Sequence, residues 1–384
     1  MKKKIIASLL CIVMSMPVLS GCSSLVEGEY TSVTAHRQGV SDEDKLSAEV
    51  TDVSTYEQLR DEILDLISSR KEYGVIRFIG YDGIVEADVS EACMEISYDT
   101  PIGAYAVYYL TSSVNKIVSY YEAEMYITYK KTARQINSIK SANTEQKINN
   151  QVKLAMQTYS PSIAILTDIN GIAKESITEE VRSVYYDDPS FIVCLPDITV
   201  SFYPDTDKEK IIEITFEYPY PDSTLQTMEE LLMTSVDNAV EPFAGFDTPQ
   251  MLLSLCNSLV DIAEYVDVQT EGVSVEGIEM YNTAYGAIVT GTADSEGFAT
   301  AYKLLCDKTG IESYVVEGRR DNDEHMWNIV KIGEDYYHVD VSALAETGST
   351  GALFRTDSDM RKNYWWDTDK YPPCLGSLTY ADLS

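Results

Sequence analysis

Three residues in the last quarter of the chain have the types that nucleophilic catalysis uses: Ser295, His325 and Asp340. In such chemistry a side-chain hydroxyl or thiol attacks a carbonyl carbon, a histidine takes up the proton, and an acid fixes the tautomer of the histidine. The chain has only three histidines, and the first of them, His36, lies in a polar N-terminal stretch. Histidine-based catalysis would therefore use His325 or His338.

Ser295 lies where a nucleophile is best supported. The stretch Gly291–Ala299 reads GTADSEGFA and opens a predicted helix that runs to about Thr309. Unpaired N–H groups and the helix dipole favour negative charge at such a start. A serine hydroxyl is much harder to ionise than a thiol, so Ser295 would need a true general base. The alternative is that Ser295 only caps the helix, beside Asp294.

His325 and Asp340 fall on two consecutive predicted strands, joined by a tight turn at Gly333–Glu334. If these are the two central turn residues, Trp327 faces Asp340 across the strand pair and His325 is the diagonal neighbour on the same face. The spacing therefore predicts that Ser295, His325 and Asp340 converge in one cleft. His338 lies two residues from Asp340 on the same strand face and is the competing histidine, with a structural role as the alternative.

Three other features offer weaker candidates. Cys306 lies about 16 Å from Ser295 along a straight helix, which excludes it as a substitute nucleophile. The tryptophans Trp327, Trp365 and Trp366 are candidates for lining a substrate groove, with core packing as the alternative. The cysteines beyond residue 22 form no metal-binding pattern and sit mostly in apolar runs, which predicts buried free thiols. Neither a metal nor another cofactor is expected.

The N-terminus predicts export. Three lysines precede an apolar run, Ile5–Leu19, and then comes Leu19-Ser20-Gly21-Cys22, an order typical of a secretory signal. This last stretch resembles the bacterial lipobox, whose cysteine is lipidated and becomes the mature N-terminus. The resemblance implies a lipid anchor at Cys22 and a bacterial cell-surface location, with an ordinary signal peptide as the alternative. The following polar residues, up to about 50, indicate a tether.

Charge excludes one class of partner. Without residues 1–21 the chain has 26 basic and 62 acidic residues, a formal charge of −36. Such a chain repels nucleic acid, so nucleic-acid binding is not expected. The acidic residues are scattered along the sequence, which indicates solubility and gives no localised signal for a basic ligand.

Residues from about 51 to 222 contain an internal repeat at a spacing of about 88 residues. The matched segments are Val75–Phe78 with Ile163–Leu166, Tyr81–Ile84 with Ile169–Ile172, Ser97–Pro101 with Tyr185–Pro189, and Ile127–Tyr129 with Ile214–Phe216. Each copy is expected to contain a helix, a strand, a helix and two longer strands. We therefore predict two duplicated small α+β modules, whose role would be spacing or the binding of a partner.

The rest of the chain is expected to form a larger α+β domain, with a helix packed on an antiparallel sheet. The predicted organisation is a signal peptide (1–21), a polar tether (22–50), module copy 1 (51–134), module copy 2 (135–222) and a C-terminal domain (223–384).

The order of the C-terminal motifs resembles the transglutaminase-like superfamily. Members show a G-x-x-x-C-x-G-Y/F-A helix start, then H-x-W-N, then W/Y-Y-x-V-D; this chain has GTADSEGFA, H-M-W-N at His325 and Y-Y-H-V-D at Asp340. The resemblance covers about Thr248–Cys374. It implies a papain-like α+β fold and acyl transfer through a thioester, without a metal. Ser295 stands where the family has its nucleophilic cysteine, so a thioester cannot form.

Two functions remain open. The first is a catalytically impaired domain that binds a peptide, protein or cell-wall ligand at the cell surface; the second is an active acyl-transfer hydrolase or peptidase that uses Ser295, His325 and Asp340. A third possibility is an engineered Cys-to-Ser change, which the genomic codon at position 295 would decide.

Overall fold

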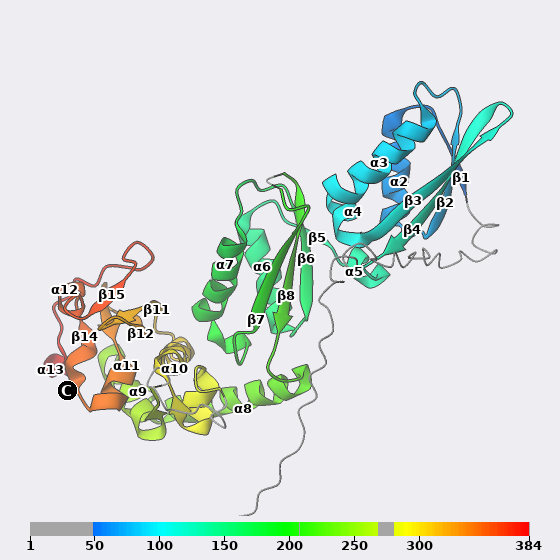
Figure 1. The fold of residues 1–384 in the computed structure, drawn as a ribbon. Coiled ribbons are helices and arrows are strands. Elements are labelled where there is room, and N and C mark those ends of the chain that lie inside the picture. Colours follow the sequence, from blue (N-terminus) through cyan, green and yellow to red (C-terminus); the bar gives the residue numbers. More distant parts are fainter. Residues whose placement is uncertain (1–48, 207, 268–279, 384) are drawn as a thin grey trace, which may run out of the picture. The chain divides into compact units, whose positions relative to one another are not determined.

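The computed structural model describes residues 49–206, 208–267 and 280–383 (Figure 1). The predicted signal peptide, Cys22 and almost all of the predicted tether lie outside these residues. Among the helices that are described, none is both long enough and apolar enough to cross a membrane. The described chain mixes helices with several sheets, as expected for an α+β protein.

The first module is a four-stranded sheet covered by helices. Its elements are β1 (Val50–Val53), α2 (Tyr56–Ser68), β2 (Tyr73–Phe78), α3 (Val85–Asp99), α4 (Pro101–Ala106), β3 (Val107–Ile117) and β4 (Tyr120–Tyr129). Helix α2 buries Leu59, Ile63 and Ile67 at the spacing of one helical face. Its cap is Thr55, which accepts a hydrogen bond from the Gln58 N–H.

The second module repeats this arrangement with a shorter first strand. Its elements are α5 (Ala133–Asn137), β5 (Lys140–Ser141), α6 (Glu145–Gln157), β6 (Ser162–Thr167), α7 (Lys174–Asp187), the 3-10 turn η1 (Pro189–Phe191), β7 (Asp197–Tyr203) and β8 (Lys210–Glu217). The sheet orders are β1-β2-β4-β3 and β5-β6-β8-β7, each with one parallel pair followed by two antiparallel pairs. The equal strand order agrees with the repeat in the sequence; a common origin of the two modules stays a prediction.

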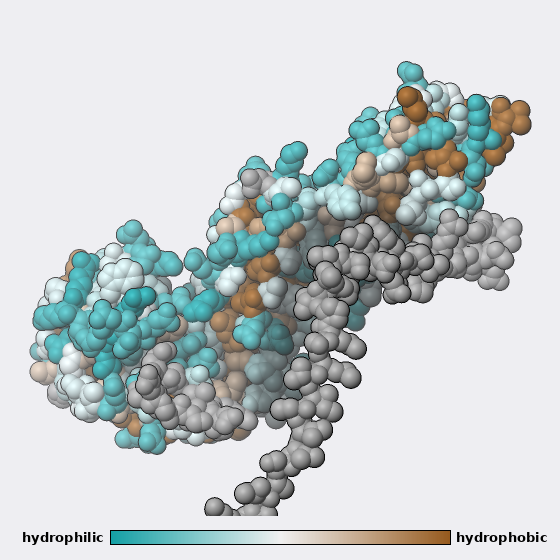
Figure 2. Space-filling view, viewed as in Figure 1, coloured by the Kyte–Doolittle hydropathy of each residue, from teal (hydrophilic) through white to brown (hydrophobic). Residues whose placement is uncertain are grey.

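The modules differ in one respect that the sequence expectation missed. Residues Pro101–Ala106 form helix α4, because Thr100 caps them and Pro101 occupies the first turn. Strand β3 therefore begins only at Val107. Exposed apolar side chains also gather in this first module, near the β3–β4 hairpin at Ile117 and Val118, whereas the C-terminal unit is mostly hydrophilic in the same view (Figure 2).

The C-terminal unit begins with helices. They are α8 (Asp222–Val240), η2 (Glu241–Phe243), α9 (Thr248–Ile262), the π-turn η3 (Gly286–Thr290) and α10 (Ser295–Lys308), with the short parallel pair β9 (Glu264–Tyr265) and β10 (Thr292–Ala293) between them. Asp247 caps α9, and Pro249 lies in its first turn. Helix α10 is buried along most of its length, from Gly297 to Cys306.

A five-stranded antiparallel sheet packs against α10. Its strands are β11 (Ser313–Arg320), β12 (Asp323–Ile332), β13 (Asp335–Val339), β14 (Leu353–Arg355) and β15 (Tyr364–Trp366), in the order β14-β13-β12-β11-β15, and the short helices are α11 (Val341–Thr347), η4 (Thr350–Ala352), α12 (Asp357–Met360) and α13 (Tyr380–Leu383). A helix packed on an antiparallel sheet is the arrangement that the sequence predicts for this domain. Strands β14 and β15 are three residues long, too short for their sequence pattern to be read.

Buried residues of the second module and of the C-terminal unit belong to one hydrophobic core, which includes Val181 and Tyr185 of α7 and Phe298 and Tyr302 of α10. The second module therefore packs on the C-terminal unit and is not merely tethered to it.

The predicted buried thiols are confirmed. All five cysteines beyond residue 22 are free and buried: Cys93, Cys194, Cys256, Cys306 and Cys374. Burial raises the pKa of the Cys306 thiol, in the interior face of α10, so this residue is neither accessible nor ionised as a nucleophile would be.

Candidate active site

The start of α10 places Ser295 as the first residue of the helix. The cap is Asp294, whose carboxylate accepts a hydrogen bond from the Gly297 N–H at 2.9 Å. Gly297 is required at this point, because a Cβ there would lie 2.3 Å from the carbonyl oxygen of Tyr281. The hypothesis that Ser295 caps the helix is therefore wrong, since Asp294 performs that role and leaves the serine side chain for another contact.

That contact is with the strand that carries the histidine. The Met326 backbone N–H donates to Ser295 Oγ at 3.4 Å, which is a long hydrogen bond. Among the hydrogen bonds of the described residues, none joins Ser295 Oγ to the ring of the adjacent His325. Ser295 and His325 line the same cavity, but the serine hydroxyl lacks the direct bond to a base that an active nucleophile needs.

His325 and Asp340 are joined directly, at 2.8 Å between Nε2 and Oδ2. The predicted strand register explains this contact: Ile332 pairs with Asp335, so Gly333 and Glu334 are the two turn residues. Both side chains are buried, Asp340 at 1 % exposure and His325 at 7 %. Nε2 is the ring atom that contacts the carboxylate, and among the described residues none forms a hydrogen bond with His325 Nδ1.

Asp340 is stabilised as an anion by more than the histidine. Its carboxylate also accepts hydrogen bonds from the hydroxyls of Ser342 at 2.6 Å and Tyr364 at 2.7 Å and from the Ala343 N–H at 2.9 Å. Burial alone would raise the pKa of Asp340, but His325 and these donors outweigh it and lower the pKa to about 2. The pair therefore contains a permanent carboxylate at neutral pH.

Sequence reasoning missed two members of this cluster. Ser342 follows Asp340 by two residues, and a hydroxyl so close to a buried carboxylate is a signal that could have been used. Tyr364 lies 24 residues from Asp340 and reaches it only because β15 pairs with β11. Nothing in the local sequence around Tyr364 indicates this contact.

Of this cluster, His325 lines a cavity of about 320 Å³, together with Ser295. The lining residues are Tyr265, Val266, Asp267, Asp294, Ser295, Glu296, Arg320, Asp321, Asp323, Glu324, His325, Met326 and Glu346. Seven of these thirteen are acidic, against 62 of 384 in the whole chain, so negative charge is concentrated here. Burial raises the pKa of Asp294 to about 7, which means that this carboxyl is only partly ionised at neutral pH.

The three tryptophans predicted for a substrate groove do not line this cavity. Trp327 and Trp366 are 1 % and 6 % exposed and pack against each other in the core beneath the sheet. Trp365 is exposed but does not line the cavity. Trp327 does share a strand face with His325, as expected. The cavity reaches only the end of that face, and Tyr364 and Trp366 cover the rest.

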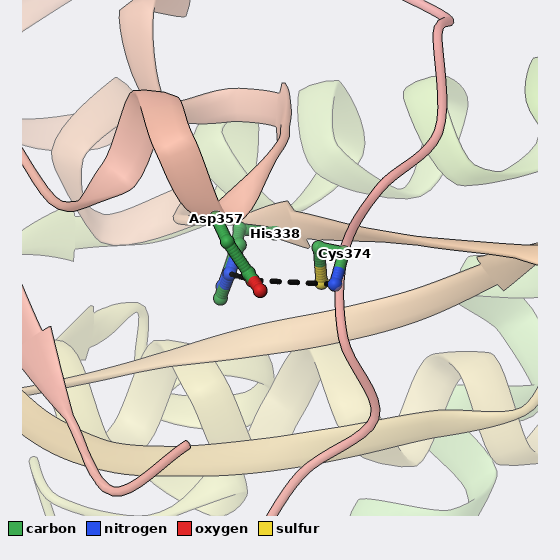
Figure 3. A group of neighbouring side chains, drawn as sticks. All are labelled: His338, Asp357 and Cys374. Carbon is green, nitrogen blue, oxygen red and sulfur yellow. Dashed lines mark hydrogen bonds and ion pairs between the residues drawn. The ribbon is translucent and has the colours of Figure 1, made fainter.

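The competing histidine, His338, belongs to a separate group with Asp357 and Cys374, in which His338 and Cys374 are buried and Asp357 is half-buried (Figure 3). One potential metal-ligand atom from each lies within 4.8 Å of the others. The Trp327 indole N–H donates to His338 Nδ1 at 2.9 Å, so the ring proton must be on Nε2, which contacts Asp357 Oδ1 at 2.9 Å. A metal on Nε2 would leave the ring without a proton. The three residues therefore fit a hydrogen-bonded cluster better than a metal site.

Comparisons with known proteins give little further support. No protein-family model matches the sequence, and no curated protein matches it. One similar solved structure is described as a TGase, at 10 % identity over 56 % of this chain and 60 % of that chain, with a TM-score of 0.27. Another is described as a candidate cysteine protease from Cytophaga hutchinsonii, at 11 % identity over 39 % of this chain and 62 % of that chain, with a TM-score of 0.23. The matches span about three fifths of each of those proteins, and their scores are too low to carry an argument.

Proposed function

We propose that the C-terminal unit is a transglutaminase-like domain that has lost its chemistry and binds a peptide, protein or cell-wall ligand in the cavity around Ser295. The observation that carries this proposal is the environment of the serine. Ser295 Oγ accepts a backbone N–H from Met326, and no hydrogen bond in the described part of the chain links it to the His325 ring. A hydroxyl without a bonded base is a poor nucleophile at neutral pH.

The chemistry of the ligand follows from the cavity wall. Of the seven acidic residues, Glu346 is neutralised by Arg320 at 2.8 Å, and Glu296 accepts a hydrogen bond from Tyr186. Asp321, Asp323 and Glu324, around the turn between β11 and β12, are exposed and take part in none of the ion pairs recorded for the described residues. A ligand with a free amine, such as a lysine-containing peptide, would be attracted to this rim.

The second candidate function, an active Ser-His-Asp hydrolase, is favoured by one observation. The bond between His325 and Asp340 is intact and buried, so a base held in one orientation is still present. A small movement that brings Ser295 Oγ within about 3 Å of Nδ1 would complete the relay, since hydrogen bonds between catalytic groups are often longer without substrate.

We further propose that lipidation at Cys22 holds the protein at the bacterial cell surface, on the basis of its leader sequence. Replacement Cys22→Ala should release the protein from the membrane fraction or leave the precursor uncut. Membrane association that is unchanged in this variant would contradict the anchor.

Binding and turnover are tested together with the wild type and Ser295→Ala. We expect both to bind a lysine-containing peptide with the same affinity, more weakly after acetylation of the lysine, and to cleave none of a panel of amide substrates. Binding should tighten as pH rises through about 7, because Asp294 then becomes charged. Turnover by the wild type that disappears in Ser295→Ala would instead establish the hydrolase.

If the surroundings of position 295 are retained, a cysteine placed there should be reactive. In Ser295→Cys the new thiol lies at a helix start next to His325, so we expect its thiolate to be alkylated by iodoacetamide at neutral pH. Removing the histidine with His325→Ala should slow this reaction. Labelling no faster than in Ser295→Ala would show that the surrounding site has decayed as well.

A further inference from the structure

Helix α7 of the second module contacts two segments next to Ser295, the start of α10 and strand β11. At the start of α10, the Glu296 carboxylate accepts a hydrogen bond from the Tyr186 hydroxyl at 2.7 Å, and Glu296 is the neighbour of Ser295. At the sheet, Arg182 forms an ion pair with Glu317 at 2.5 Å. Glu317 pairs in the sheet with Met326, whose N–H donates to Ser295 Oγ. Arg182 and Tyr186, one turn apart on α7, therefore contact both the start of α10 and the β11 residue that pairs with Met326.

The two contacts form one connected group. Arg182 also donates to the Tyr186 hydroxyl at 3.4 Å, and its guanidinium lies 5.6 Å from the centre of the Tyr186 ring. Tyr186 is 5 % exposed, so its hydroxyl depends on Glu296 and Arg182 for its hydrogen bonds. Burial raises the pKa of Glu296, while the hydrogen bond from Tyr186 and the positive charge of Arg182 lower it.

We propose that Arg182 and Tyr186 are positioning residues for the cavity, through which the second module sets the charge and orientation of Glu296 beside position 295. This inference rests on the proposed function only in taking position 295 as the centre of the site. It assigns the second module a role other than spacing: a partner that moved α7 would change the electrostatics of the cavity without touching it.

The charge of Arg182 can be read at position 295 with a titrating probe. In Ser295→Cys, the rate of alkylation by iodoacetamide across about pH 5 to 10 gives a midpoint that reports the pKa of the thiol, whether or not the site activates it. The charged or titratable groups around that thiol are Asp294 and Glu296 beside it, His325 on β12, Glu317 on β11, Arg182 and Tyr186 on α7, and the cavity residues Tyr265, Asp267, Arg320, Asp321, Asp323, Glu324 and Glu346.

Arg182→Gln removes one positive charge from this environment. We expect the midpoint to rise by about half a pH unit, which makes labelling at pH 7 roughly threefold slower. Arg182→Lys keeps the charge and should restore a midpoint close to that of Ser295→Cys. A role in packing alone would give no such dependence on charge, and thermal unfolding of each variant would show whether packing has changed.

Lys153→Gln is a matched control. Lys153 also belongs to the second module and pairs with Asp188 at 2.9 Å, with side chains 39 % and 38 % exposed, against 37 % and 39 % for Arg182 and Glu317. Neither Lys153 nor Asp188 lines the cavity. The control variant loses the same charge from the same module and should leave the midpoint unchanged. Equal midpoints for Arg182→Gln, Lys153→Gln and the Ser295→Cys parent would overturn the proposal.

Failure of the proposed function would look different. A parent midpoint near 8.5, the ordinary value of a free thiol, with no dependence on His325, would mean that the site is not retained. The difference between Arg182→Gln and Lys153→Gln would still be measurable in that case, so the role of α7 is decided by its own comparison.

Discussion

The C-terminal unit contains two histidine–aspartate pairs with nearly the same bond and different surroundings. His325 and Asp340 are 2.8 Å apart, and His338 and Asp357 are 2.9 Å apart. One ring nitrogen of His325 is left free of the carboxylate, and His325 lines an open cavity beside Ser295. Both ring nitrogens of His338 are used, one by Trp327 and one by Asp357, and His338 is fully buried.

The difference shows why a histidine–carboxylate pair is not by itself a catalytic site. A base needs one ring nitrogen that can exchange a proton with another molecule. His338 has none, and burial lowers its pKa although Asp357 opposes the change. We therefore assign the His338 pair to stability and the His325 pair to the cavity. Each assignment can be tested by breaking one pair while the other serves as its reference.

The largest effect on stability is expected at the enclosed pair. His338→Ala leaves the buried Trp327 N–H without its acceptor and creates a cavity, and the Asp357 carboxylate keeps only the Cys374 N–H, at 3.2 Å. The expected loss is about 3 kcal/mol in the free energy of unfolding, measured by urea titration. His325→Ala should cost less, because Asp340 keeps three other donors. An equal or larger loss in His325→Ala would contradict the assignment.

The opposite ranking of the two histidines is expected for the reactivity of a thiol at position 295. In the Ser295→Cys background, His325→Ala should slow alkylation at pH 7 about tenfold, equivalent to about 1.4 kcal/mol, because the thiolate loses its proton acceptor. A conservative replacement of the enclosed histidine, His338→Gln, should leave the labelling rate within about twofold in protein that remains folded. A similar slowing in both variants would mean that the two pairs are coupled and that the comparison fails.

Whether the sequence could predict a contact at these sites depends on how many residues separate the two partners along the chain. The contact of His325 with Asp340 follows from a two-residue turn and strand alternation, and the helix start at Ser295 follows from Asp294 and Gly297. These are local rules. Trp327 was misjudged because alternation gives the face of a strand but not which part of that face is covered.

The remaining contacts come from pairings that local patterns do not encode. Tyr364 reaches Asp340 through strand β15, which is only three residues long. Tyr186 reaches Glu296 across 110 residues, from a different module. Both depend on the packing of elements far apart in the chain, which hydrophobic periodicity does not specify.

A smaller effect is expected when one donor to Asp340 is removed. Because its pKa of about 2 lies below the unfolded value near 3.9, Asp340 contributes stability above about pH 4 that is lost as pH falls towards 2. Tyr364→Phe removes one hydrogen bond to the anion, so its pKa rises and this contribution shrinks. We expect a loss of about 1 kcal/mol at pH 7, and less below pH 3. A loss that does not change with pH would indicate that only packing was affected.

The smallest effect, none, is expected from metal removal. Figure 3 shows His338, Asp357 and Cys374 directed towards one another, an arrangement that could be mistaken for a zinc site. The Trp327 hydrogen bond fixes the ring proton on His338 Nε2, and burial together with Asp357 raises the pKa of the Cys374 thiol, so two of the three ligands would have to lose a proton to bind zinc. Thermal unfolding with and without a strong chelator should therefore give the same midpoint, and metal analysis of the purified protein should find no stoichiometric zinc. A structural zinc would lower the midpoint on chelation and would require that Trp327 lose its bond to His338. Trp327→Phe sharpens the test, because it frees His338 Nδ1 to carry the proton: if metal affinity appears only in that variant, the tautomer set by Trp327 is what keeps this pair metal-free.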